Sequence, residues 1–149
     1  TLDADQIMQL TRIVRRVPIA DHIARYALQL ARLTRHQLPE APEFVRQYVM
    51  WGAGPRASQY LVLGAKARAI LQGRYYVSQD DIRAVALPVL RHRIKTNFNA
   101  DAEGVSTDDI VRRLIDFVPR VIEDQPHDRT HRHREPAPDI FRSADAGQA

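Results

Sequence analysis

The sequence contains no cysteine. Without thiols the chain forms no disulfide, supplies no thiolate nucleophile and binds no zinc through cysteine. These absences exclude the disulfide-stapled class of small secreted domains and any cysteine-based catalysis. We therefore expect a cytoplasmic protein.

Long apolar runs are also missing. No stretch of about 18 consecutive apolar residues occurs, so no transmembrane helix is predicted. The first residues, TLDADQIMQL, lack the basic start and apolar run of a secretory signal peptide. We expect a soluble chain with no membrane span. Because it begins with Thr1 rather than Met, we expect it to be a piece of a longer protein or a processed form.

Common catalytic motifs are missing as well. The sequence has no GxxxxGK[ST] loop, no GxGxxG after a strand, no serine elbow and no HExxH pair. The chain alone therefore cannot hold a triphosphate in the usual way. We expect it to be catalytically silent when isolated.

The charge balance is basic, with a net charge of +4 and a pI near 9.8. Such a balance is typical of nucleic-acid-binding proteins, because basic faces attract phosphate. Here, however, only Lys66 and Lys95 are lysines, and the arginines alternate with acids instead of forming a block. This distribution favours a solvated surface of mixed charge over a binding stripe. The local cluster of Arg91, Arg93 and Lys95 could bind phosphate, but it is interpreted in the same way, as a solvated edge. A small nucleic-acid-binding domain remains the alternative.

The chain has 149 residues, of which 44% are hydrophobic, enough for one globular domain. Apolar residues recur at spacings of three and four, which predicts an all-α bundle of five to six short helices. The first two helices are expected at residues 3–16, with the stripe Ile7, Leu10, Val14 and Val17, and at residues 18–35, starting at Pro18. A short helix is expected after Pro42, and a longer one at residues 55–72 with the stripe Tyr60, Leu63, Ala67 and Ile70. The last two are expected after Ser78, with a bend or restart at Pro88, and after Ser106.

Capping patterns support several of these boundaries. Asp3 is followed three residues later by Gln6, and VSQDDI and VSTDDI each place an aspartate three residues after a serine. This position explains the paired acids as helix-start residues rather than as metal ligands or acid/base groups. Gly73 predicts the end of the helix that starts at Pro55, because glycine readily adopts the left-handed backbone conformation that follows a helix.

Between the last two helices we expect a connector with one short strand around Ile94. Trp51, beside a turn, is interpreted as a core anchor rather than a base-stacking residue. His92 is interpreted as a half-buried, hydrogen-bonded histidine at a helix end, and it is assigned no role.

From residue 120 onward the chain is rich in proline, histidine and charge, and few apolar residues are available to bury. Residues 1–119 are therefore predicted to form the helical domain, and residues 120–149 a flexible, disordered tail. His127, His131 and His133 are metal-ligating residue types, but solvated tail histidines are the favoured interpretation because no rigid scaffold fixes them. No metal site is predicted.

Arg56 is the main candidate site residue. If Pro55 opens a helix, Arg56 lies in the first turn, where free N–H groups and the helix dipole favour an anion over a cation. Either the guanidinium meets a phosphate there, or it bends back to a nearby acid such as Glu43. The residues alone leave both alternatives open.

A wider pattern surrounds Arg56. The stretch from WGAGPRAS through KARAILQGRYYVSQDDI to VLRHRI resembles the C-terminal part of MoxR AAA+ ATPases. In that family a GASPRA-like turn opens a helix, a KA-x-A-x-L-x-GR segment ends it, and V-[ST]-x-[DE]-D-[IV] and HR[IL] elements follow. Tyr26 and Leu33-Thr34-Arg35 match the family's lid as well. The resemblance covers most of residues 1–118; one departure is Gly54, where many relatives have serine.

This resemblance implies a AAA+ lid fold in which Arg56 is the sensor 2 residue, with Gly54 and Pro55 shaping its turn. It also implies that the full-length protein is an ATPase using ATP and Mg²⁺, while the isolated chain holds no cofactor. The implied partners are an N-terminal AAA+ core of the same chain, neighbouring subunits in a hexamer and a von Willebrand A-type protein, in a chaperone-like remodelling machine. The other alternative is an adaptor or oligomerisation domain whose Arg56 meets a neighbour's carboxylate.

Overall fold

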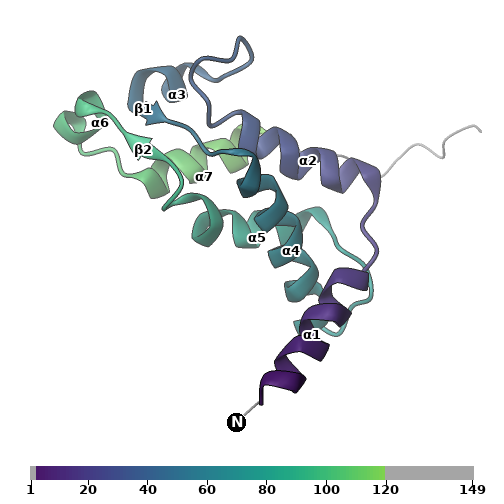
Figure 1. Ribbon diagram of the computed structural model, residues 1–149. Helices are drawn as coiled ribbons and strands as arrows, with labels where there is room; N and C mark the ends of the chain where they lie inside the picture. Colours follow the sequence, from purple (N-terminus) through teal and green to yellow (C-terminus); the bar gives the residue numbers. More distant parts are fainter. Residues whose placement is uncertain (1–2, 120–149) are drawn as a thin grey trace, which may run out of the picture.

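The computed structural model describes residues 3–119. The predicted tail, with its three histidines, lies outside the described residues. Within them the chain is all-α, as expected, with one small two-stranded sheet (Figure 1). The elements are α1 (Ala4–Arg16), α2 (Asp21–Arg32), α3 (Glu43–Tyr48), β1 (Val49–Trp51), α4 (Pro55–Leu71), α5 (Gln79–Leu90), β2 (Lys95–Thr96), α6 (Phe98–Glu103) and α7 (Thr107–Phe117).

All three predicted capping boxes are present. At the start of α1, the backbone N–H of Gln6 donates to the Asp3 carboxylate at 2.8 Å, and the Gln6 side chain accepts from the Asp3 N–H at 3.0 Å. Serines at the starts of α5 and α7 form the same reciprocal pair with aspartates three residues later. Gly73 ends the turn after α4 with a φ of 71°, as its position predicted.

Helices α4 and α5 pack along each other, and α2 and α7 pack against this pair. The predicted apolar stripe of α4 is wrong, because Tyr60 is 46% exposed. The buried face of α4 consists instead of Ala57, Leu61, Ala65 and Ala69, which are fully inaccessible. Since α4 carries apolar residues on several sides, its periodicity does not single out the face that its neighbours cover. The three alanines of this buried face allow α2 and α5 to approach closely.

Two predicted helix boundaries are corrected around prolines. Pro18 does not open the second helix, because the first N–H groups of α2 bond to the Ala20 carbonyl and the helix begins at Asp21. Pro88 does not restart the next one, because α5 is continuous to Leu90. Only the last residues of α5 follow Pro88, so ending the helix at the proline would relieve little strain.

The small sheet joins two segments far apart in the sequence. β2 is the strand expected around Ile94, and it pairs antiparallel with β1. The segment after it is not a simple connector, because the Asn97 side chain caps α6 by accepting from the Ala100 N–H at 3.1 Å. Trp51 is not the predicted core anchor; it is 65% exposed on β1, and Val49 fills the core instead. The strand pairing shifts register between Val49 and Trp51, so the two side chains do not point to the same side of the sheet.

Helix α1 is present as predicted, but of its predicted apolar stripe only Val17, the C-cap residue, is buried. Ile7 and Leu10 are 51% and 46% exposed, and none of the residues of α1 itself is buried. The helix extends away from the body of the domain and packs mainly against α4 (Figure 1). Among residues 3–119, every helix is too short or too polar to cross a bilayer.

Candidate functional site

The site is centred on the first turn of α4. Gly54 is the N-cap, Pro55 is the first helical residue and Arg56 follows, as predicted. No side chain caps this end, and the first turn contains no acidic residue. Pro55 has no N–H and the Ala57 N–H donates to the Gly54 carbonyl at 3.0 Å, so the Arg56 N–H is the donor of this turn that remains available to an external acceptor.

The Arg56 side chain is exposed. Within residues 3–119 its guanidinium has no hydrogen-bond or ion-pair partner, and no bond to Glu43 is formed. The alternative of an internal acid is thus not realised in this part of the chain. A guanidinium fork and the positive end of a 17-residue helix lie together, which is the combination that binds a phosphate group.

The end of α2 holds the turn that precedes Arg56. The Thr34 hydroxyl, fully buried, accepts a hydrogen bond from the Ala53 N–H at 2.8 Å and donates to the Ala31 carbonyl at 2.7 Å. Nε of Arg35 donates to the Ala53 carbonyl at 3.0 Å. The N–H and the carbonyl of Ala53 are therefore both held by the Thr34-Arg35 stretch. The family resemblance includes these two residues, but the sequence alone does not show that they bind Ala53.

Gly52 is required by the same contact. A Cβ at this position would lie 2.4 Å from the Thr34 carbonyl oxygen and 2.8 Å from the Arg35 Cα. Both are backbone atoms, so neither side can yield easily. Gly54, in contrast, has no atom within 4 Å of an added Cβ, so the serine of many relatives would fit there.

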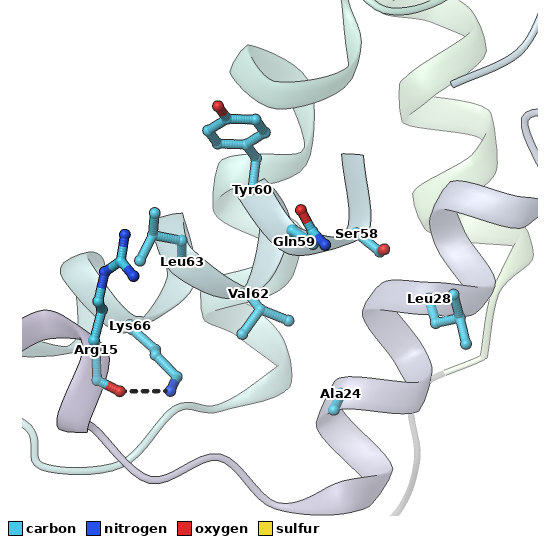
Figure 2. A pocket seen from close by; sticks show the side chains of 9 residues that line it. All are labelled: Arg15, Ala24, Leu28, Ser58, Gln59, Tyr60, Val62, Leu63 and Lys66. Carbon is cyan, nitrogen blue, oxygen red and sulfur yellow. Dashed lines mark hydrogen bonds between the residues drawn. The ribbon is translucent and has the colours of Figure 1, made fainter. Parts of the chain in front are cut away.

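A groove of about 640 Å³ lies beside the site, between α1, α2 and α4 (Figure 2). Ala24 and Leu28 of α2 and Val62 and Leu63 of α4 form its apolar walls. Ser58, Gln59 and Tyr60 line the end nearest the start of α4, and Arg15 and Lys66 line the other end.

Three basic groups lie in or beside this groove. Nζ of Lys66 donates to the Arg15 carbonyl at 3.1 Å, but Arg15, Arg56 and Lys66 form no ion pair with the acids of residues 3–119. Some other arginines of the domain do pair with acids, as Arg91 does with Asp108 at 2.7 Å. The groove therefore presents uncompensated positive charge to an external partner.

An ion pair between the buried Asp81 and the partly exposed Arg74 is the main interaction that sequence analysis missed. Asp81 is 1% exposed and accepts two hydrogen bonds from Arg74, at 2.6 and 2.8 Å. The N–H and hydroxyl of Ser78 add two more at 2.9 Å. Burial acts to raise the pKa of Asp81, but the bonds from Arg74 and Ser78 together hold that pKa below its ordinary value. Arg74 belongs to the GR motif and Asp81 to the VSQDD motif, so this ion pair links the two motifs in the folded chain.

The other candidates have local roles. Arg93 lies over the Tyr60 ring at 4.7 Å from its centroid and donates to the Val89 carbonyl at 2.6 Å. With Arg91 also paired, the predicted basic cluster is largely engaged within the domain, which does not favour nucleic-acid binding. His92 is exposed beside Arg93, not half-buried as predicted. No group of three or more metal-ligating residues occurs within residues 3–119.

Comparisons with known proteins identify the kind of domain to which this site belongs. Residues 42–114 match the family described as AAA lid domain. Chaperone MoxR1 of Mycobacterium tuberculosis is 27% identical over 117 residues, which are 78% of this chain and 31% of that protein. Protein MoxR of Paracoccus denitrificans is 43% identical over 65 residues, 44% of this chain and 18% of that one. A crystal structure of a "putative ATPase" from Cytophaga hutchinsonii has a TM-score of 0.73 and 31% identity, covering 79% of this chain and 36% of that chain.

Proposed function

The chain carries the lid domain of a MoxR-family AAA+ ATPase, and we propose that this lid senses bound nucleotide through Arg56. The chain spans only 31% of the length of MoxR1. In this proposal the remainder of the full-length protein includes an N-terminal AAA+ core that binds ATP and Mg²⁺. The supporting observation is that the Arg56 guanidinium is exposed and, among the described residues, unpaired at the uncapped start of α4.

The residues at this site fit the phosphate part of ATP but not its metal ion. The first turn of α4 offers the Arg56 guanidinium and the Arg56 backbone N–H, and no carboxylate. These groups match the terminal phosphate oxygens, whereas Mg²⁺ prefers oxygen ligands such as carboxylates. The metal would therefore be held by the core, while Arg56 contacts the γ-phosphate.

The proposed mechanism follows from the charge on that phosphate. ATP hydrolysis in the core removes the γ-phosphate as an anchor, and Arg56 then loses a charge-assisted hydrogen bond. The lid is released to rotate relative to the core. Because Thr34 and Arg35 fix the turn before Arg56 to α2, and α4 packs on α2 and α5, the domain would move as one unit.

At the level of the assembly, we extend the proposal from the family. AAA+ ATPases work as oligomers, and we propose a cytoplasmic hexamer that acts as a chaperone-like remodelling machine with a von Willebrand A-type partner. The unpaired basic groups along the groove support a contact surface on this side of the lid.

In the full-length protein, Arg56→Ala is expected to lower ATP turnover by at least about tenfold, because a hydrogen bond to a charged group is worth about 1.5–3 kcal/mol. Arg56→Lys should retain part of the activity, since it keeps the charge but loses the fork. Phosphate release at saturating ATP measures the effect.

Two controls accompany this experiment. Arg112→Ala removes another exposed arginine, 59% accessible and paired only with surface acids, and should leave turnover unchanged. The isolated chain with Arg56→Ala should unfold at the wild-type temperature, because the exposed side chain makes no hydrogen bond or ion pair within residues 3–119. Wild-type turnover in Arg56→Ala would refute the assignment.

A further inference from the structure

Three exposed apolar side chains lie at the end of α4 and in the loop that follows it. Leu71 is 84% exposed, Tyr75 88% and Tyr76 62%, and we call these residues the tyrosine surface. Leu71 follows Arg56 by 15 residues in α4, which is about 22 Å along the helix axis. The tyrosine surface is therefore separate from the Arg56 site. Exposed apolar side chains that gather in one place mark an interaction site.

Arg74 connects the two tyrosines. Its guanidinium carbon lies 5.9 Å from the centroid of the Tyr76 ring, and Arg74 and Tyr75 line the same cavity of about 400 Å³. Apolar side chains and Arg16 also line this cavity. Arg74 is already bonded to Asp81, whereas Arg16 is exposed and forms no ion pair within residues 3–119. The surface therefore offers aromatic rings, an apolar cavity and one cation to a ligand.

We propose that residues 135–141 of the same chain, Glu-Pro-Ala-Pro-Asp-Ile-Phe, dock on the tyrosine surface. Proline-rich segments pack well on exposed aromatic rings, because their restricted backbone loses little entropy on binding. The two large apolar residues that end the segment match the apolar cavity, and its two acids complement the charge of Arg16. The inference does not depend on the role of Arg56.

The described part of the chain ends close to this surface. Nε2 of Gln79 donates to the Pro119 carbonyl at 3.3 Å. Gln79 follows Tyr75 by four residues, so the two lie at most about 14 Å apart. The 16 residues from 120 to 135 reach up to about 55 Å, which is enough to bring the segment to the tyrosines. A short connection of this kind gives an effective concentration of about millimolar, so even a weak contact is populated.

A second copy of the chain is a poorer occupant of the tyrosine surface. Three side chains bury far less than the roughly 1,200 Å² of a stable interface between separate proteins. A segment of the same chain needs no such area, because it is already held nearby.

Paramagnetic relaxation in NMR spectra of the 149-residue chain tests the docking. The chain has no cysteine, so Ser143→Cys carries a single spin label, two residues beyond Phe141. This label should speed the relaxation of the amides of residues 71–76. In Leu71→Ser combined with Tyr75→Ser, that enhancement should fall at least about threefold, because the segment loses most of its apolar contact area. Both side chains are more than 80% exposed, so the variant should stay folded.

Two further variants make the test specific. Ile140→Ser combined with Phe141→Ser should reproduce the loss from the side of the segment. Phe98→Ser is the matched control, since Phe98 is 80% exposed but lies on α6, far from the end of α4 (Figure 1). It should leave the relaxation of residues 71–76 unchanged.

Three results would overturn the proposal. A segment that is only tethered nearby would relax residues 71–76 equally in the wild type and in Leu71→Ser combined with Tyr75→Ser. Relaxation centred on another surface would place the segment elsewhere. In a mixture of spin-labelled chain and isotope-labelled chain without the spin label, enhancement at residues 71–76 would assign the contact to a second copy.

Discussion

Asp81→Asn is expected to lower the free energy of unfolding of the isolated chain by about 2 kcal/mol, because the buried side chain loses its charge-assisted hydrogen bonds from Arg74 and Ser78. Asp81 is 1% exposed and is bonded twice by Arg74 and twice by Ser78. The asparagine keeps the shape of the side chain but neither its charge nor its full accepting capacity. Urea denaturation measures the loss.

Asp109→Asn is the matched control for this variant. Asp109 occupies the same position in the capping box of α7, but its side chain is 44% exposed and its ion pair is with the exposed Arg112. Its substitution should cost less than about 1 kcal/mol, the usual effect of a cap or a surface pair. Similar losses in the two variants would contradict a special role for the Arg74 pair.

The same ion pair gives the chain an acid-sensitive stability. The pKa of Asp81 is lower in the folded chain than its ordinary value of 3.8. A lowered folded-state pKa contributes stability that is fully present above the unfolded-state value and is lost as the pH falls through the folded-state value. The wild-type chain should therefore lose stability below about pH 4, and Asp81→Asn should lose less over that range.

Gly52→Ala is expected to destabilise the chain by about 2 kcal/mol or more, because overpacking against atoms that cannot move costs about 1–3 kcal/mol or more. The added Cβ would meet the Thr34 carbonyl oxygen at 2.4 Å. Relief requires the turn to separate from α2, which would break the bonds from Ala53 to Thr34 and Arg35. In the full-length protein we expect reduced ATP turnover as well, since the same turn positions Arg56.

Gly54→Ala controls for this change two residues away. Its Cβ meets nothing within 4 Å, and the φ of −77° suits any residue. Its stability should change by less than about 1 kcal/mol, because the entropy that alanine removes from the unfolded chain is offset by its poorer fit at the N-cap. Thermal unfolding of both variants compares them, and equal midpoints would show that the Thr34 contact does not require glycine.

Features fixed by neighbouring residues could be predicted from the sequence. The starts of α1, α5 and α7 depend on side chains that bond three residues along the chain, so spacing alone locates them. The position of Arg56 likewise follows from Pro55, which fixes where α4 begins.

Features that depend on tertiary partners could not be predicted. The buried face of α4 and the uncovered face of α1 are set by which helices pack together, and apolar periodicity does not contain that information. The bonds from Thr34 and Arg35 to Ala53 cross 19 and 18 residues. The register shift in β1 decides the exposure of Trp51.

The most direct test of the central claim is the distance between lid and core in the full-length protein in its ATP and ADP states. The described chain contains no cysteine, so Asp101→Cys, at an exposed position on α6, provides a label site to pair with one in the core. The account predicts that the lid–core distance differs between the two nucleotide states in the wild type, and that this difference disappears in Arg56→Ala with nucleotide still bound. An unchanged nucleotide-dependent movement in Arg56→Ala would contradict it.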